Sequence, residues 1–240
     1  MSRYLCHDEP TLLSFEAKVI DARPGAVRLD RTAFHPGGGG QLADRGVLRW
    51  RDGERKIIGI DNQGGQFWHL LDGDPATALP QGAVAVEIDR EFRLRQASLH
   101  TGLHLLSALV YQGFAGALIT GCQIADDGTA RCDFDLPEVD NDKLRALEPE
   151  LNALIVRAIP VRTFYATAAD FDAEPSLRRS AAVAPPPGDD GTVRIVEIEG
   201  FDRQGCGGTH VANTGESRPL RIAKIENKGR RNRRIRVALV

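Results

Sequence analysis

Hydrophobic and polar positions alternate up to about residue 88, in short runs separated by turn residues. Alternation with a period of two is typical of strands that bury one face. Short strands at this spacing favour a small barrel or a curled sheet. The pattern predicts strands within 15–34, 46–50, 55–60, 66–71 and 82–89.

From Glu91 onward the pattern becomes helical. Leu99, Leu103, Leu106 and Val110 recur at intervals of three and four residues, which places them on one face of a helix. We predict a helix of about four to five turns over 92–112.

The remaining chain mixes both periods. A turn at Asp126–Gly128 favours a hairpin. Asp140 or Asn141 is the candidate N-cap for a helix in which Pro149 is expected to introduce a kink. The expected elements are strands 117–125 and 129–136, the helix 144–159, a loop 183–191, a strand 192–200 and a closing hairpin 219–227 with 233–240. These elements predict an α+β fold with a β-barrel-like domain at 1–88 and an α+β domain at 89–240.

Composition narrows the class of protein. The chain has 240 residues, 42% of them hydrophobic, and a formal net charge of −2, so it can fill a core but does not attract nucleic acid as a whole. Cys6, Cys122, Cys132 and Cys206 lie too far apart to indicate a disulfide framework, and a reducing cytoplasm is expected. The first residues lack the pattern of a signal peptide and no stretch is apolar enough to span a membrane, so neither secretion nor insertion is expected.

Two pairs of metal-binding residues stand out. His100 and His104 are four residues apart on one helix face, and Cys206 and His210 flank the Gly207–Gly208 turn. One histidine pair alone is more often incidental, but two pairs supply the nitrogen and sulfur donors that zinc prefers. We predict a zinc site formed by these four side chains. The other histidines, His7, His35 and His69, have no such partner spacing.

The number of ligands leaves the role of the zinc open. Four protein ligands would close a structural site, whereas one thiolate among histidines resembles open, catalytic sites. No glutamate lies between His100 and His104, which excludes a metalloprotease of the HExxH type. The glycine run 37–40 lacks the Lys-Ser/Thr of a P-loop, so it is either a flexible loop or one whose backbone approaches a ligand closely.

These motifs carry a family resemblance. HTGLHLL at 100–106 followed by CGGTHVANTGE at 206–216 resembles the zinc-binding editing domain of alanyl-tRNA synthetase and its free-standing relatives, the alanyl-tRNA editing proteins. TAFHPGGGGQLADRGVL at 32–48 and KIENKGRRNRRIRVAL at 224–239 are similar to other segments of that family. The length resembles the medium-length, free-standing form.

The resemblance implies an aminoacyl-tRNA deacylase that hydrolyses mischarged tRNA(Ala), chiefly Ser-tRNA(Ala) and also Gly-tRNA(Ala). It implies zinc on His100, His104 and Cys206, with His210 as a weaker or displaceable ligand. Free-standing editors resemble this chain in having threonine at the position of Thr120. The resemblance therefore makes Thr120 the candidate that hydrogen-bonds the serine hydroxyl. The alternative is that Thr120 is an ordinary strand residue without a functional role. Gln41 is a further candidate at the catalytic site. The likeness departs at His35, where relatives more often have tyrosine.

Binding tRNA also requires local positive charge. Basic residues cluster near the C-terminus and before the predicted zinc helix, which favours phosphate contacts by Arg93, Lys228, Arg231 and Arg234. A solvated hairpin face would have the same composition. Two other functions remain open: a non-catalytic, zinc-stabilised RNA-binding module, and a zinc hydrolase for a small ester or amide.

Overall fold

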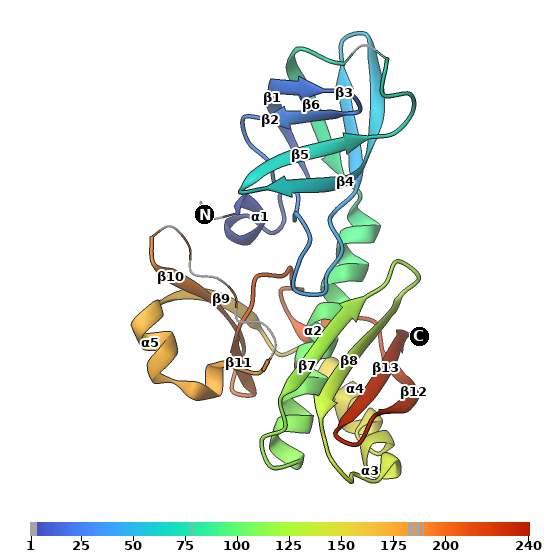
Figure 1. Ribbon diagram of the computed structural model, residues 1–240, viewed down its shortest axis with the longest axis vertical. Coiled ribbons are helices and arrows are strands. Elements are labelled where there is room, and N and C mark those ends of the chain that lie inside the picture. The colour runs from blue at the N-terminus through green and yellow to red at the C-terminus, as the bar shows by residue number, and fades with distance from the viewer. Residues whose placement is uncertain (1–3, 78, 182–184, 186–187, 189) are drawn as a thin grey trace. The chain divides into compact units, whose positions relative to one another are not determined.

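A closed six-stranded β-barrel forms the first part of the protein in the computed structural model (Figure 1). The structure describes residues 4–77, 79–181, 185, 188 and 190–240. The barrel order is β1-β2-β5-β4-β3-β6, and antiparallel pairing of β6 with β1 closes it. Its strands are β1 (Ser14–Arg23), β2 (Ala26–Leu29), β3 (Gly46–Trp50), β4 (Gly53–Gln63), β5 (Gln66–Leu71) and β6 (Gly82–Ile88).

The barrel follows directly from the alternating pattern. Val84, Val86 and Ile88 of β6 point inward and pack with Leu48 and Ile57, while the residues between them on β6 are exposed. Closure leaves no free strand edge among these six strands. The predicted barrel is confirmed, but the long run 15–34 forms two strands.

Helix α2 (Arg90–Gly113) confirms the predicted helix. The Asp89 carboxylate accepts a hydrogen bond of 3.0 Å from the Phe92 backbone N–H, which caps the start of the helix. Leu99, Leu106 and Val110 are completely buried, as the spacing requires.

The chain separates into two units by its contacts. One comprises Met1–Gly38 with Leu42–Leu94, and the other comprises Gly39–Gln41 with Arg95–Val240. The short helix α1 (Leu5–Asp8) belongs to the first unit. Gly39–Gln41 thus group with the second unit, although the predicted boundary at 88 assigns them to the first domain.

Two antiparallel sheets form the second unit (Figure 1). The larger has the order β12-β13-β8-β7, and the side chains of α2 and α4 share its core. The smaller has the order β11-β10-β9. The strands are β7 (Ile119–Ile124), β8 (Thr129–Asp135), β9 (Val161–Thr167), β10 (Thr192–Ile198), β11 (Asp202–Gly205), β12 (Leu220–Lys228) and β13 (Asn232–Leu239).

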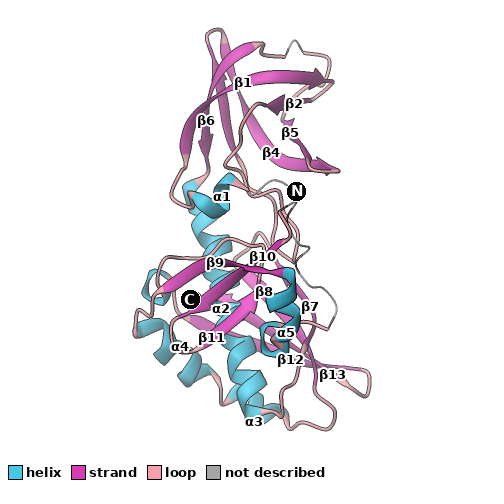
Figure 2. Ribbon diagram, turned by 90° about the vertical axis from the view of Figure 1, so that its left-hand side faces the viewer, coloured by secondary structure: helices cyan, strands magenta, loops and turns pink. Residues whose placement is uncertain are grey.

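The predicted helix 144–159 is divided. Helix α3 (Asn141–Arg145) is capped by Asp140, whose carboxylate accepts a hydrogen bond of 2.9 Å from the Asp142 backbone N–H. Helix α4 (Glu148–Val156) follows. Pro149 lies in the first turn of α4, where its missing N–H costs nothing, so it begins a helix instead of kinking one. Helix α5 (Ala168–Ala173) lies beside the small sheet (Figure 2). Its Phe171 packs with Val193 and Ile195 of β10. The pattern did not predict α5, β9 or β11, and part of the expected loop 183–191 lies outside the described residues.

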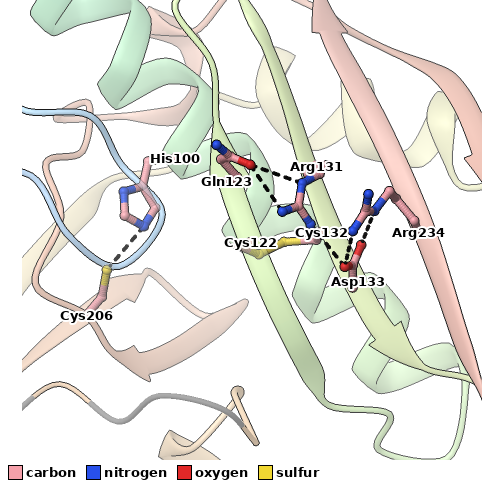
Figure 3. Close-up of a disulfide and its surroundings, with 8 residues drawn as sticks. All are labelled: His100, Cys122, Gln123, Arg131, Cys132, Asp133, Cys206 and Arg234. Atoms are coloured by element: carbon pink, nitrogen blue, oxygen red, sulfur yellow. Dashed lines mark hydrogen bonds and ion pairs between the residues drawn. A yellow bond between two sulfur atoms is a disulfide. The ribbon is translucent and has the colours of Figure 1, made fainter. Parts of the chain in front are cut away.

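The cysteines were not expected to indicate a disulfide framework, but one pair of them does form a disulfide. Cys122 on β7 and Cys132 on β8 are joined by a disulfide (Figure 3). The hairpin register sets these two residues directly opposite each other, and spacing along the chain does not reveal that pairing. Among the helices of the described residues, none is long and apolar enough to cross a membrane.

Candidate metal centre

Four side chains converge in the second unit, as the sequence predicted. His100 and His104 come from α2, and Cys206 and His210 come from the loop after β11; their donor atoms all lie within 4.8 Å of one another. The Cys206 Sγ is 3.4 Å from the Nε2 of His100 and 3.4 Å from the Nε2 of His210. Figure 3 shows Cys206 facing His100. His210 is the most exposed of the four.

Gln41 holds the ring of His100. Its Oε1 is 2.8 Å from the His100 Nδ1 and also accepts from the Thr209 backbone N–H at 2.9 Å. Because the Thr209 N–H can only donate, it identifies the amide atom as oxygen, and the His100 Nδ1 must therefore carry the proton. The His100 Nε2 is left with a lone pair toward Cys206, which is the tautomer that binds a metal.

Thr101 plays the same part for His210. The Val211 backbone N–H donates to the Thr101 Oγ1 at 3.3 Å, and that oxygen is 3.1 Å from the His210 Nδ1. When the His210 Nδ1 donates to this oxygen, its Nε2 keeps a lone pair toward Cys206, 3.4 Å away. Two of the three imidazoles therefore have a partner that sets their orientation.

The loop that carries Cys206 is held by a buried arginine. Arg194 of β10 donates from Nη1 to the carbonyl oxygens of Cys206 and Gly208, at 2.9 Å each. Gly208 lies so close to His100 that a Cβ there would overlap the imidazole ring. Glycine is required at 208 by this close approach as much as by the turn.

The surroundings of Cys206 and His210 favour the metal-binding forms of these two side chains. Burial alone would raise the pKa of the Cys206 thiol, but the neighbouring imidazoles of His100 and His104 outweigh burial and hold that pKa well below its ordinary value. Burial, together with the neighbouring His104, lowers the pKa of His210 well below that of a free imidazole. Thiolate and neutral imidazole are the forms that coordinate a metal.

The donor set fits a metal ion. One sulfur and three ring nitrogens match the ligands of zinc in proteins. The Nδ1 of His104 is buried without a hydrogen-bond partner among the described residues, unlike the Nδ1 atoms of His100 and His210, which have Gln41 and Thr101 as partners. The structure thus contains a His/Cys group that can hold a metal.

Known proteins resemble this chain over nearly its whole length. The alanyl-tRNA editing protein AlaX-M of Methanosarcina acetivorans is 38% identical over 239 residues, which cover 95% of this chain and 95% of that protein. AlaX-M of Methanosarcina barkeri is 39% identical over 234 residues, with 94% of each chain covered. The chain belongs to the AlaX-M family of alanyl-tRNA editing proteins. This family membership confirms the resemblance of the sequence motifs.

Longer proteins share the same segment. The alanine–tRNA ligase of Korarchaeum cryptofilum is 34% identical over 224 residues, which cover 92% of this chain but only 24% of the ligase. A sequence model of the threonyl and alanyl tRNA synthetase second additional domain matches residues 193–236. That segment of this AlaX-M family member includes Arg194, Cys206 and His210.

Thr120 lies on β7, where the pairing with β8 shifts at a bulge between Ile119 and Gly121. Its Oγ1 is buried and has no hydrogen-bond partner among the described residues. Within the described part of the chain, no hydrogen bond joins the Thr120 hydroxyl to the metal-binding residues, so its role in this AlaX-M family member remains a prediction.

The basic residues predicted to contact tRNA differ in how far their charges are exposed and unpaired. Arg93 is only 5% exposed, and its guanidinium is bound to the Asp44 carboxylate and to the Ala33 carbonyl oxygen, so it does not present its charge to a phosphate. This corrects the prediction for Arg93, whose neighbours in sequence did not reveal the partner. Arg231 is exposed but paired with Asp135, and Lys228 is exposed.

Arg234 is mostly buried. Both of its donating nitrogens bind the Asp133 carboxylate at 2.7 Å (Figure 3). The acidic partners of Arg231 and Arg234 lie on β8, far from the C-terminal basic residues in sequence. The C-terminal hairpin therefore carries less unpaired positive charge than its composition indicates.

Sequence analysis did not identify Thr101, Arg194 or Thr209. The sequence does contain a signal for Arg194, because this arginine interrupts the apolar run of β10. An arginine buried in a strand needs carbonyl or carboxylate partners. Thr101 and Thr209 had none, since each is a small polar residue beside a histidine.

Proposed function

We propose that this protein is a trans-editing hydrolase, which cleaves the ester between tRNA(Ala) and a wrong amino acid, chiefly serine and secondly glycine. The observation that supports this function best is the cluster of His100, His104, Cys206 and His210, three of them buried, in a member of the AlaX-M family. A pocket for alanine cannot strongly reject the smaller glycine and discriminates poorly against one added hydroxyl. A second, hydrolytic site is therefore useful.

Zinc is the proposed metal at this cluster. Its support is the donor set and the second layer of hydrogen bonds that fixes two of the rings. When bound, zinc would supply a Lewis acid that polarises the ester carbonyl or acidifies a water molecule. Gln41 and Thr101 then act as positioning residues, and His210, the most exposed donor, is the ligand proposed to be weaker or displaced.

Thr120 is the proposed selector for serine. A buried hydroxyl without a partner costs about 1–3 kcal/mol, and a serine side chain would supply the missing hydrogen bond. In Thr120→Val the shape is retained and the hydroxyl is lost, so serine turnover should fall roughly three- to tenfold. Glycine turnover, which does not use this contact, should stay unchanged; equal losses on both substrates would contradict the assignment.

The hairpin of β12 and β13 is the proposed contact for tRNA phosphates. Lys228 and Arg231 lie at its turn with exposed side chains, and neutralised phosphates make binding depend on salt. Lys228→Gln should weaken tRNA binding and reduce the salt slope by about one. Lys143→Gln, at an exposed position on α3, is the matched control. Identical slopes in the two variants would show that Lys228 is only solvated.

The organisation is proposed to be two domains, at 1–88 and 89–240, with the reaction in the cytoplasm. The closed barrel and the separate cores of the two units support the division. The proposed substrate supports the compartment, because aminoacyl-tRNAs are used where translation occurs.

Deacylation of Ser-tRNA(Ala) tests the function. Wild-type protein should release serine, a chelator should stop the release and added zinc should restore it, while Cys206→Ala that keeps its circular dichroism spectrum should be inactive. An RNA-binding module would bind the tRNA and leave the ester intact. A hydrolase for small molecules would cleave simple esters but spare Ser-tRNA(Ala). Either of these results would overturn the proposal.

A further inference from the structure

A second group of metal-binding side chains lies in the first unit. Cys6 and His7 on α1 and His35, from the loop before β3, each place a donor atom within 4.8 Å of the others. We propose that these three side chains form a second metal site, which takes a divalent cation of the zinc class. It shares no residue with the His100 cluster, and it does not depend on the proposed editing reaction.

The chemistry of the three donors selects the class of ion. One sulfur and two imidazole nitrogens suit zinc and its neighbours in the first transition row, whereas magnesium and calcium require oxygen ligands. Three protein ligands leave one tetrahedral position for water or an external donor, as in open zinc sites. His7 is only partly buried, which provides a route for the ion and for that fourth ligand.

The fold holds His35 in place. Its backbone N–H donates to the Asp44 Oδ2 at 2.6 Å, and its carbonyl oxygen accepts from the Asp44 backbone N–H at 3.0 Å. Asp44 is itself fully buried and bound to Arg93. His35 is 2% exposed, so its backbone is held and its ring is enclosed. Little conformational entropy is then lost when an ion binds.

The other two donors come from a short helix. Backbone bonds from His7 N–H to the Tyr4 carbonyl (2.8 Å) and from Glu9 N–H to the Leu5 carbonyl (2.8 Å) shape α1, and Cys6 is 2% exposed. A four-residue helix is not stable by itself. Coordination would tie it to the loop of His35, so that metal binding contributes to the folding of this unit.

The local charge permits a cation. Arg93 is close enough to Cys6 to interact with it electrostatically, and a bare guanidinium would oppose a metal ion. The Asp44 carboxylate offsets that charge through its direct contact with Arg93. With a thiolate and two neutral imidazoles, a divalent ion would leave a net charge of +1, which an anionic fourth ligand would neutralise.

Cobalt(II) is a suitable probe because a cobalt–thiolate bond gives a charge-transfer absorption band. Each proposed site has one cysteine, so the two bands can be assigned with single variants. Metal-free wild-type protein is titrated with cobalt(II), desalted, and analysed for bound metal and absorption. The expected result is two cobalt ions per chain.

Cys6→Ser should retain one cobalt ion and the band of Cys206. Cys206→Ser should retain the band of Cys6, and the double variant should have none. Circular dichroism verifies that each variant is folded. If Cys206→Ser fails to fold, the wild-type and Cys6→Ser proteins still test the proposal. It requires two cobalt ions in the wild type and one in Cys6→Ser. One ion in the wild type, or equal metal content in wild type and Cys6→Ser, would overturn it.

Discussion

Adding one methyl group at Gly208 should damage the metal centre far more than the same change at the neighbouring Gly207. An alanine Cβ at 208 would overlap the His100 ring and lie 2.8 Å from the Gln41 Oε1. The neighbouring Gly207 has open space around the same position, with no atom within 4 Å. Neither glycine has the positive φ that disfavours alanine, so Gly207→Ala and Gly208→Ala differ mainly in this contact.

The size of the effect follows from what must move. Overpacking by one methyl group costs about 1–3 kcal/mol, and a displaced His100 also loses its hydrogen bond to Gln41, which contributes about 1 kcal/mol. The sum, about 2–4 kcal/mol, corresponds to roughly 30- to 1,000-fold in metal affinity. Gly207→Ala should change stability by less than about 0.5 kcal/mol.

Competition with a chromophoric chelator measures metal affinity in wild type and both variants, and thermal unfolding measures stability. Gly208→Ala should bind metal at least about 30-fold more weakly, and Gly207→Ala should match the wild type. Wild-type affinity in both variants would refute the close packing of Gly208 on His100. An equal loss of affinity in both variants would mean that the loop tolerates no side chain at either position, and contact with His100 would then not be the cause.

Three further changes test other parts of the structure. Gln41→Ala removes the acceptor from His100 and should lower metal affinity about 10- to 100-fold in the same chelator assay; unchanged affinity would show that Gln41 does not position the ring. Replacing both Cys122 and Cys132 by serine opens a disulfide that spans 10 residues in sequence and should lower the free energy of unfolding by roughly 3 kcal/mol in urea titrations, whereas no loss would mean that the thiols are reduced in solution. Burial lowers the pKa of His69 to about 4, so its neutral form stabilises the fold fully above the unfolded pKa near 6.5, and this stability, roughly 3 kcal/mol, is lost as the pH falls toward 4. His69→Gln should remove this part of the pH dependence of unfolding, and a slope equal to that of wild type would contradict it.

The sequence alone was sufficient for features that depend on short spacings. Alternation predicted the strands of the barrel, and intervals of three and four residues predicted α2, because strand and helix geometry assign each residue to a face. The same geometry placed His100 beside His104. The motif CGGTHVANTGE, in order after HTGLHLL, indicated the family that the AlaX-M relatives confirm.

Only the tertiary structure decided which distant residues meet. Strand register joined Cys122 to Cys132, and packing brought Gln41 to His100 and Asp44 to Arg93. The first of these overturned an expectation about the cysteines, and the last removed a predicted RNA contact.

His35 shows the physical reason. From the sequence it is one histidine before a glycine run, without a partner at a metal-binding spacing. The fold of the first unit places it within reach of Cys6 and His7. Local spacing determines the face of an element on which a side chain lies, but its neighbours from other segments depend on how the closed barrel and the loops pack, which no short window of sequence contains.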